Sequence, residues 1–245
     1  MNYAIIAAGE GSRLAKEGFP LPKPMVQLHG EMLIDRLIRI FVKNGAKTIQ
    51  IIINEESELL ETHLLSSTYP VSLKIIKKST PSSLHSFYEL LKASQQLDAL
   101  CLTTTDTVFR EEEFADYIAA FQQNTHVGGL MAVTTFVDDE SPLFVSVDAH
   151  QHITAFTDTN QNSTPYISGG IYCLRRPALN RAIEAVEKGT NRMRNFQRYL
   201  IETNIPLQAY SFSKIVDIDH VWDITTAERF LSEQQPTPNH EVTLK

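Results

Sequence analysis

The sequence predicts an α/β fold in which a mostly parallel central sheet is flanked by helices, with a small antiparallel excursion in the second half. Short apolar runs typical of buried strands alternate with segments of helical periodicity. A chain of 245 residues with 42% hydrophobic content can also bury one large core. We therefore expect a single domain over residues 1–235 and a flexible tail at 236–245.

The first half of the chain alternates regularly. The apolar run at residues 3–7 is typical of a buried first strand. Apolar residues between 33 and 41 then recur at helical spacing, and Asn44-Gly45 is a typical helix end. The same alternation predicts strands at 48–53, 71–76 and 99–103, and helices at 57–66, 84–93 and 111–122.

The second half changes character, because short apolar runs are separated there by polar turn residues. This pattern predicts antiparallel strands at 130–135, 143–147 and 153–157. A longer strand is expected at 166–174. Helices are expected at 177–188, 192–203 and 224–234.

A glycine-rich loop follows the first strand, at the sheet edge where α/β proteins bind ligands. Gly9 and Gly11 let the backbone approach phosphate oxygens, and successive N–H groups can surround an anion. Arg13 adds a planar fork of donors. A dinucleotide-binding fingerprint would need glycine where Leu14 stands, and no Gly-Lys-Ser/Thr follows, so neither a Rossmann dehydrogenase nor a P-loop NTPase is favoured.

A second cation lies a short loop further on. Pro22 and Pro24 fix the backbone on both sides of Lys23, so this lysine stands on a stiffened segment that can aim its ammonium group.

The glycine loop and the Pro-Lys-Pro segment together resemble the signature of nucleotidyltransferases that make nucleotide sugars, the NTP-transferase family with a GT-A-like, Rossmann-like fold. The resemblance implies an Mg²⁺-dependent enzyme. Such an enzyme transfers a nucleoside monophosphate from a nucleoside triphosphate to a small phosphorylated acceptor, above all a sugar-1-phosphate, and releases pyrophosphate to leave an NDP-sugar. It also implies catalytic roles for Lys23 near the reacting phosphates and for Arg13 toward the leaving pyrophosphate.

The resemblance further implies two aspartates as Mg²⁺ ligands. Asp106 follows a predicted central strand, on the same sheet edge as the glycine loop. Asp223, in the stretch Asp-Ile-Thr-Thr-Ala-Glu, matches the second aspartate of the family, and Asp219 is the reserve candidate. Magnesium is commonly held by one or two carboxylates together with substrate phosphates and waters, so two ligands suffice.

The substrate loops depart from the family pattern. Where the family has a Gly-Thr-Ala base loop, this chain has a serine-rich stretch with Ser82 and Ser83, which can equally be simple helix caps. The Glu-Lys-Pro of the sugar side is also missing, and the acceptor candidates are Asp158, Gly169 and Gly170. The proposed nucleotide-binding residues are Ala8, Gly9, Gly11, Ser12, Arg13, Lys23, Ser82 and Ser83.

Because of these departures, two alternatives stay open. One is a cytidylyltransferase acting on a non-sugar phosphate such as phosphocholine. The other is a regulator that binds a nucleotide sugar without catalysis.

Composition limits the partners of the chain. A formal net charge of −7 argues against a broad nucleic-acid or membrane-binding surface and favours small anionic substrates. Cys101 and Cys173 both lie in apolar runs, which favours buried thiols and a reducing, cytoplasmic location. Neither a secretory signal nor a spanning segment is expected. The oligomeric state is expected to be a monomer or a small homo-oligomer.

Overall fold

The computed structural model describes residues 1–9, 11–94, 96–137, 140–160 and 163–233. The predicted tail at 236–245 lies outside this part of the chain, and the single-domain organisation stays a prediction.

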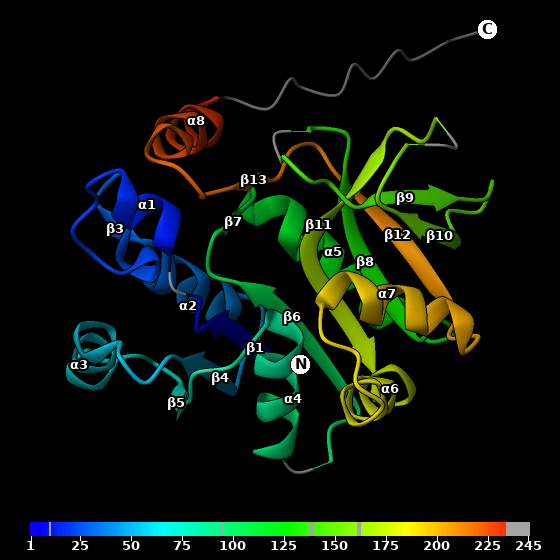
Figure 1. Cartoon of the computed structure of the whole chain (residues 1–245), viewed down its shortest axis with the longest axis horizontal. Coiled ribbons are helices and arrows are strands. Elements are labelled where there is room, and N and C mark those ends of the chain that lie inside the picture. Colours follow the sequence, from blue (N-terminus) through cyan, green and yellow to red (C-terminus); the bar gives the residue numbers. More distant parts are fainter. Residues whose placement is uncertain (10, 95, 138–139, 161–162, 234–245) are drawn as a thin grey trace, which may run out of the picture.

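Nine strands of the described chain form one mixed sheet (Figure 1), which confirms the predicted fold class. Its parallel half has the order β6-β1-β4-β5, with β1 in the middle. These strands are β6 (Ala99–Thr104), β1 (Asn2–Ala7), β4 (Thr48–Ile53) and β5 (Ser72–Lys77). Because all four run in the same direction, their carboxyl ends meet at one edge, where the glycine loop begins.

The predicted antiparallel strands continue this same sheet. The long strand β11 (Tyr166–Arg175) pairs antiparallel with β6 and joins the two halves. Beyond it lie β8 (Gly129–Thr134), β9 (Phe144–Val147), β10 (Ile153–Thr157) and β12 (Leu207–Phe212). The pairing of β12 with β8 was not predicted, because its residues alternate between buried and partly exposed and give a weak apolar signal.

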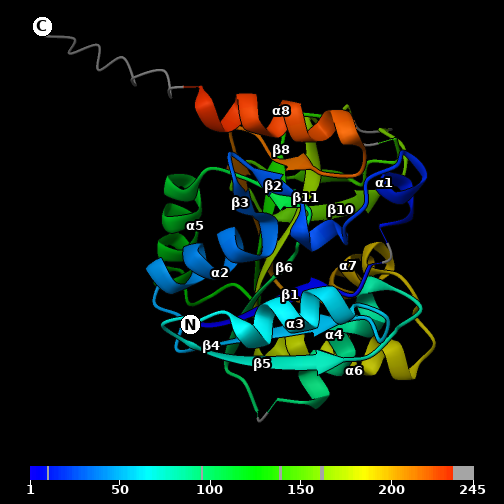
Figure 2. The same cartoon turned by 90° about the vertical axis from the view of Figure 1, so that its left-hand side faces the viewer.

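Helices cover both faces of the sheet (Figures 1 and 2). On one face lie α2 (Leu33–Lys43), α3 (Glu58–Ser66) and α5 (Glu111–Gln123), and on the other α4 (Ser83–Lys92), α6 (Arg176–Glu187) and α7 (Met193–Glu202). Alternate residues of β1 supply the two cores, since Ile5 packs in the first and Ile6 in the second. This double burial explains why the strand is apolar throughout.

A third, smaller apolar cluster lies beside the sheet edge that carries the site. It joins the short helix α1 (Ser12–Lys16) to the last helix, α8 (Val221–Ser232). Short ribbons complete it: β2 (Gln27–Leu28) with β3 (Glu31–Met32), and β7 (Thr107–Val108) with β13 (Val216–Asp217). Strands of two residues carry no readable periodicity, so none of these four was predicted.

The last helix begins at Val221, not at residue 224 as predicted. The carboxylate of Asp223 accepts hydrogen bonds from the backbone N–H groups of Asp219 and His220, so the helix begins directly after His220. The structural reason is a capping box formed by His220 and Asp223.

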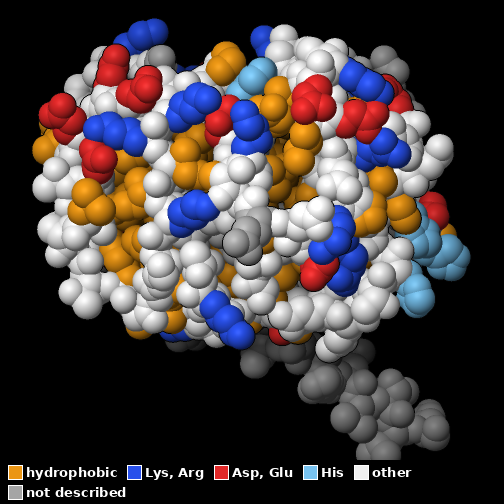
Figure 3. All heavy atoms as spheres, turned by 90° about the horizontal axis from the view of Figure 1, so that it is seen from below, with side chains coloured by type: hydrophobic (Ala, Val, Ile, Leu, Met, Phe, Trp, Pro, Cys, Tyr) orange, Lys and Arg blue, Asp and Glu red, His pale blue; other side chains and the backbone are white. Residues whose placement is uncertain are grey.

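On the face seen in Figure 3, lysine and arginine side chains lie among acidic and apolar side chains and form no continuous basic surface. Within the described residues, every helix is too short or too polar to cross a membrane.

Candidate active site

The glycine loop adopts the geometry that its glycines permit. Gly11 has a φ of +59°, in the left-handed region, and its carbonyl accepts the first helical hydrogen bond of α1 from Ala15. A Cβ at Gly11 would lie 3.1 Å from the Cβ of Lys23. A Cβ at Gly9 would meet nothing within 4 Å, because Gly9 faces open space. Gly11 is therefore needed for the fold of the loop, whereas Gly9 keeps a cavity clear.

Lys23 stands on a rigid turn, as the flanking prolines predict. Residues Lys23–Met25 form one turn of 3₁₀ helix, in which Met25 N–H donates to the carbonyl of Pro22. The side chain is only 12% exposed. Its Nζ donates to Asp106 Oδ2 at 2.6 Å and to Asp219 Oδ1 at 2.7 Å. Two carboxylates from distant parts of the chain thus converge on one ammonium group.

The β7–β13 ribbon brings these two carboxylates together. Asp106 lies between β6 and β7, and its carbonyl accepts a hydrogen bond from the N–H of Ile218. In the ribbon, Asp217 is the register partner of Thr107. Asp219 lies two residues after Asp217 and so stands beside Asp106.

Mutual charge keeps Lys23 and Asp106 ionised. Burial lowers the pKa of Lys23, but Asp106 and Asp219 outweigh it and hold that pKa above its ordinary value. Burial likewise raises the pKa of Asp106, yet the charge of Lys23 outweighs it, and that pKa lies below its usual range. Lys23 is therefore protonated and Asp106 ionised at neutral pH.

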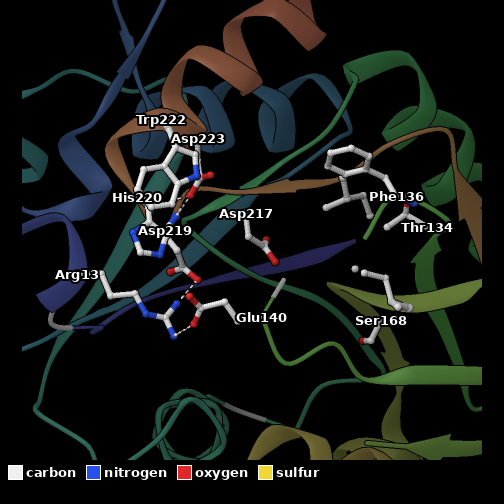
Figure 4. Close-up of a pocket in the computed structure, with 13 residues that line it drawn as sticks. Arg13, Thr134, Phe136, Glu140, Ser168, Asp217, Asp219, His220, Trp222 and Asp223 are labelled. Carbon is white, nitrogen blue, oxygen red and sulfur yellow. Dashed lines mark hydrogen bonds and ion pairs between the residues drawn. The ribbon is translucent and has the colours of Figure 1, made fainter. Parts of the chain in front are cut away.

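Arg13 extends the cluster toward solvent. Its Nη1 donates to Asp219 Oδ2 at 2.6 Å, and its Nη2 lies 3.9 Å from Glu140 Oε2 (Figure 4). The side chain is half exposed. Asp219 consequently contacts both predicted catalytic cations.

Asp223 has a different environment. Its Oδ2 caps α8 by accepting the N–H groups of Asp219, at 2.8 Å, and His220, at 2.6 Å. Asp223 is 5% exposed and no ion pair to Lys23 or Arg13 is found for it in the described structure. Of the two candidates considered from the sequence, the reserve, Asp219, is the one that lies with Asp106. The favoured one, Asp223, holds Asp219 in place through the backbone.

Glu17 links the two segments that carry this cluster. Its carboxylate accepts from Val221 N–H at 2.8 Å and pairs with His220 Nδ1 at 2.5 Å. The hydrogen bond to Glu17 raises the pKa of His220. The His220 ring also stacks on Trp222, with centroids 4.0 Å apart (Figure 4). The start of α8 is thereby tied to the end of α1.

A cavity of about 610 Å³ lies beside the cluster, over the glycine loop. Its lining includes four of the predicted nucleotide-binding residues from this loop, together with Lys23, Ser82 and Ser83; the four are Ala8, Gly9, Gly11 and Ser12. Ser82 caps α4 by accepting from His85 N–H. The position of these serines is thus compatible with both roles considered for them, which are capping of the helix and contact with a nucleotide.

A second cavity, of about 390 Å³, adjoins the first, because Ser82 and Ser83 line both. It contains Gly170, whereas Gly169 lines a third space of about 170 Å³ around Asp219 and Trp222. Both glycines have packing reasons as well. A Cβ at Gly169 would lie 2.3 Å from Ile215, and Gly170 has a φ of +73°.

Asp158 lies apart from the other acceptor candidates. Its carboxylate pairs with Arg194 at 2.6 Å and with Arg198 at 2.7 Å, and it does not line the second cavity. The sequence reasoning missed Arg192, which lines that cavity together with Arg194. The Arg-x-Arg spacing at the start of a predicted helix was the signal that could have revealed them.

Comparison with known families identifies the family of the chain. The model of the MobA-like NTP transferase domain matches residues 3–196, which include the glycine loop, Lys23, Asp106 and Arg194 of α7. The chain belongs to this family. It is therefore a nucleotidyltransferase of the NTP-transferase type, as the resemblance of the glycine loop implied. Comparison with curated protein sequences gives no match.

Solved structures share the fold of this MobA-like domain over nearly its whole length. The chain is similar to the inositol-1-phosphate CTP transferase from T. maritima, with a TM-score of 0.77 and 15% identity over 95% of this chain and 96% of that one. A putative glucose-1-phosphate thymidylyltransferase from Bacillus anthracis, in complex with a sucrose, gives a TM-score of 0.82 at 16% identity, covering 96% and 97%. A UDP-glucose pyrophosphorylase complexed with UDP-glucose gives 0.77 at 13%, covering 94% and 97%.

Proposed function

We propose that this protein transfers a nucleoside monophosphate from a nucleoside triphosphate to a sugar-1-phosphate or closely similar phosphate, and releases pyrophosphate. The observation that carries the proposal is the convergence of Asp106 and Asp219 on Lys23, beside the glycine-loop cavity and close to a second cavity. One cavity suits the nucleotide and the other the acceptor. The family and the three structural neighbours support the same class of reaction.

The reaction needs no protein base, because the acceptor phosphate is already an anion at neutral pH. One of its oxygens attacks the α-phosphorus of the triphosphate. As the new P–O bond forms, the bond between the α-phosphorus and the bridging oxygen breaks, and pyrophosphate takes the electron pair. Catalysis then consists of holding the two phosphates in line and neutralising charge.

The residues of the cluster suit these tasks. The ammonium of Lys23 lies on a stiff turn at the wall of the nucleotide cavity, where it can contact the reacting phosphates. Arg13, on the other side of Asp219, offers a guanidinium fork to the leaving pyrophosphate. Backbone N–H groups of the glycine loop can hold the remaining phosphate oxygens.

We further propose Asp106 and Asp219, in place of Asp223, as the pair that holds Mg²⁺. Their oxygens lie within 2.7 Å of one nitrogen, so they can also converge on one cation. No cluster of three or more metal-ligating side chains occurs in the described residues, and Mg²⁺ shared with substrate phosphates needs none. Bound there, Mg²⁺ would neutralise phosphate charge and orient the triphosphate.

Pyrophosphate release tests the proposal. The full chain is incubated with Mg²⁺, each of ATP, CTP, GTP, UTP and dTTP, and either glucose 1-phosphate, inositol 1-phosphate or phosphocholine. We expect release with one nucleotide and one acceptor, and loss of release when EDTA removes the metal. If a nucleotide binds and no pair reacts, the protein binds nucleotides without transferring them, and the catalytic proposal fails.

A further inference from the structure

The start of α7 brings arginines to the wall of the second cavity, in a chain that lacks the Glu-Lys-Pro of the family's sugar side. Arg192 and Arg194 both line this cavity. They come from the residue that precedes α7 and from its first turn, where the helix dipole also favours an anion. Two guanidinium groups thus face a space that adjoins the nucleotide cavity.

The two arginines differ in how they are held. The Nη1 of Arg194 donates to Asp158 at 2.6 Å, and its Nη2 donates to the carbonyl of Ser141 at 2.9 Å. Arg198 pairs with the other oxygen of Asp158. Asp158 therefore fixes Arg194 in orientation, and the three side chains together keep one net positive charge.

Arg192, in contrast, is exposed; its carbonyl accepts from the N–H groups of Asn195 and Phe196, whereas its guanidinium has no hydrogen bond or ion pair within the described residues. An arginine that lines a polar cavity without a partner has all five N–H donors free for a ligand. A guanidinium fork matches two oxygens of a phosphate.

The rest of the cavity wall is uncharged apart from Asp217, and its apolar side chains are Leu143 and Met193. Ser168 Oγ donates to Gln197 Oε1 at 3.1 Å, and Gln197 Nε2 donates to the hydroxyl of Tyr172 at 3.4 Å. Burial raises the pKa of Tyr172 to about 12, so its hydroxyl stays protonated. Such a row of hydroxyl and amide groups suits the hydroxyls of a polyol or a sugar ring.

A trimethylammonium group needs other surroundings. It is recognised by open aromatic faces and carboxylates, and it is repelled by guanidinium groups. The ring of Tyr172 is 7% exposed, so it offers little open face. Two arginines on the wall outweigh the single carboxylate of Asp217.

From these observations we infer that Arg192 and Arg194 bind the phosphate of the acceptor, in place of the missing lysine, and that the acceptor is a hydroxyl-rich monophosphate and not phosphocholine. Asp158 is a positioning residue for Arg194. This inference rests on the proposed function. It assigns recognition of the acceptor, within that same site, to the residues at the start of α7.

The test compares Arg192→Ala with Arg229→Ala, which removes an exposed arginine of α8 that lines none of the three cavities. With the nucleotide that reacts, we expect Arg192→Ala to raise the KM for glucose 1-phosphate or inositol 1-phosphate at least tenfold. The KM for the nucleotide and the values for Arg229→Ala stay within twofold. Arg192→Lys keeps the charge without the fork and gives an intermediate KM. Phosphocholine gives no product.

Two results would overturn the inference while leaving the proposed function intact. One is an unchanged acceptor KM in Arg192→Ala, and the other is turnover of phosphocholine at a rate similar to that of the sugar phosphate. If the unmutated chain gives no turnover at all, calorimetric titration with glucose 1-phosphate separates the two ideas. Binding of glucose 1-phosphate that weakens tenfold in Arg192→Ala but not in Arg229→Ala supports the inference. Equal or absent binding in the unmutated chain, Arg192→Ala and Arg229→Ala refutes it.

Discussion

The cavity over the glycine loop takes its lining from four short stretches of the parallel half of the chain, whereas the acceptor-side cavity gathers residues between Ser82 and Asp217 from both halves of the sheet. The first depends on backbone conformation, in particular on Gly11 and the Lys23 turn. The second depends on side chains that other side chains hold, such as Arg194 on Asp158. Under the proposed function, nucleotide binding would depend on the backbone of the loop, and acceptor binding on exchangeable side chains.

The largest effect is expected at Lys23, which lines the cavity over the glycine loop and contacts both Asp106 and Asp219. Lys23→Ala removes the ammonium group that Asp106 and Asp219 share, so two carboxylates are left facing each other and the phosphates lose a cation. We expect kcat to fall about 10²–10³-fold. Lys16→Ala, on the exposed side of α1, is the control and leaves kcat unchanged. Steady-state pyrophosphate release measures both, and a tenfold or smaller loss for Lys23→Ala would contradict the assigned role.

Two alanine substitutions separate fold from binding within the glycine loop. Gly11→Ala forces a φ of +59° on alanine and brings its Cβ against Lys23, so we expect about 1–3 kcal/mol lower stability in urea unfolding. Gly9→Ala meets no protein atom within 4 Å and leaves stability unchanged. Its Cβ enters the cavity instead, and the KM for the nucleotide rises about tenfold by loss of close phosphate contacts. Equal stabilities of the two variants would show that the loop is not strained at Gly11.

Asp158→Asn tests whether Asp158 positions Arg194 at the acceptor-side cavity. The change loosens Arg194 without removing a ligand-binding group. Because exposed ion pairs are weak, we expect only about a three- to tenfold rise in the KM for the acceptor, with the nucleotide KM unchanged. Asp148→Asn, which removes a similar exposed pair with His152 in the β9–β10 turn, is the matched control. A change in the KM for the nucleotide would contradict the assignment of Asp158 to acceptor binding.

The smallest effect is expected away from both cavities. Arg39 and Lys43 hold the pKa of Glu111 down, to about 2, through hydrogen bonds. A depressed pKa contributes stability above the unfolded-state pKa of about 4.3, and this contribution is lost as pH falls toward 2. After allowance for solvent screening, Glu111→Gln should cost ~1 kcal/mol at pH 7 and nothing near pH 2. A cost in unfolding free energy that is independent of pH would contradict the charge pairing.

The nucleotide side was largely predictable from the sequence because its signals are local. Gly11 and the prolines beside Lys23 act on their own backbone, and Asp106 follows a strand whose burial is evident from its apolar residues. The parallel strands and the helices that cover them were predicted for the same reason. Their periodicities are long enough to recognise.

The other contacts of the site were less predictable because they join distant segments. Asp219 reaches Asp106 only through the two-residue strands β7 and β13, which leave no periodicity in the sequence. The family pattern therefore favoured Asp223, whose capping role depends on where α8 begins. In the same way, the pairing of Asp158 with arginines 36 and 40 residues away could not be foreseen from spacing.

The central claim is that Asp219, held by Lys23 and Arg13, works with Asp106, while Asp223 only caps α8. The most direct test is the kcat for pyrophosphate release, as a function of Mg²⁺ concentration, in Asp219→Asn and Asp223→Asn that are shown to be folded by circular dichroism. We predict that Asp219→Asn loses about 100-fold or more in kcat and needs more Mg²⁺, whereas Asp223→Asn keeps its Mg²⁺ dependence and loses mainly stability. The reverse pattern, with Asp219→Asn active and a folded Asp223→Asn inactive, would contradict the account.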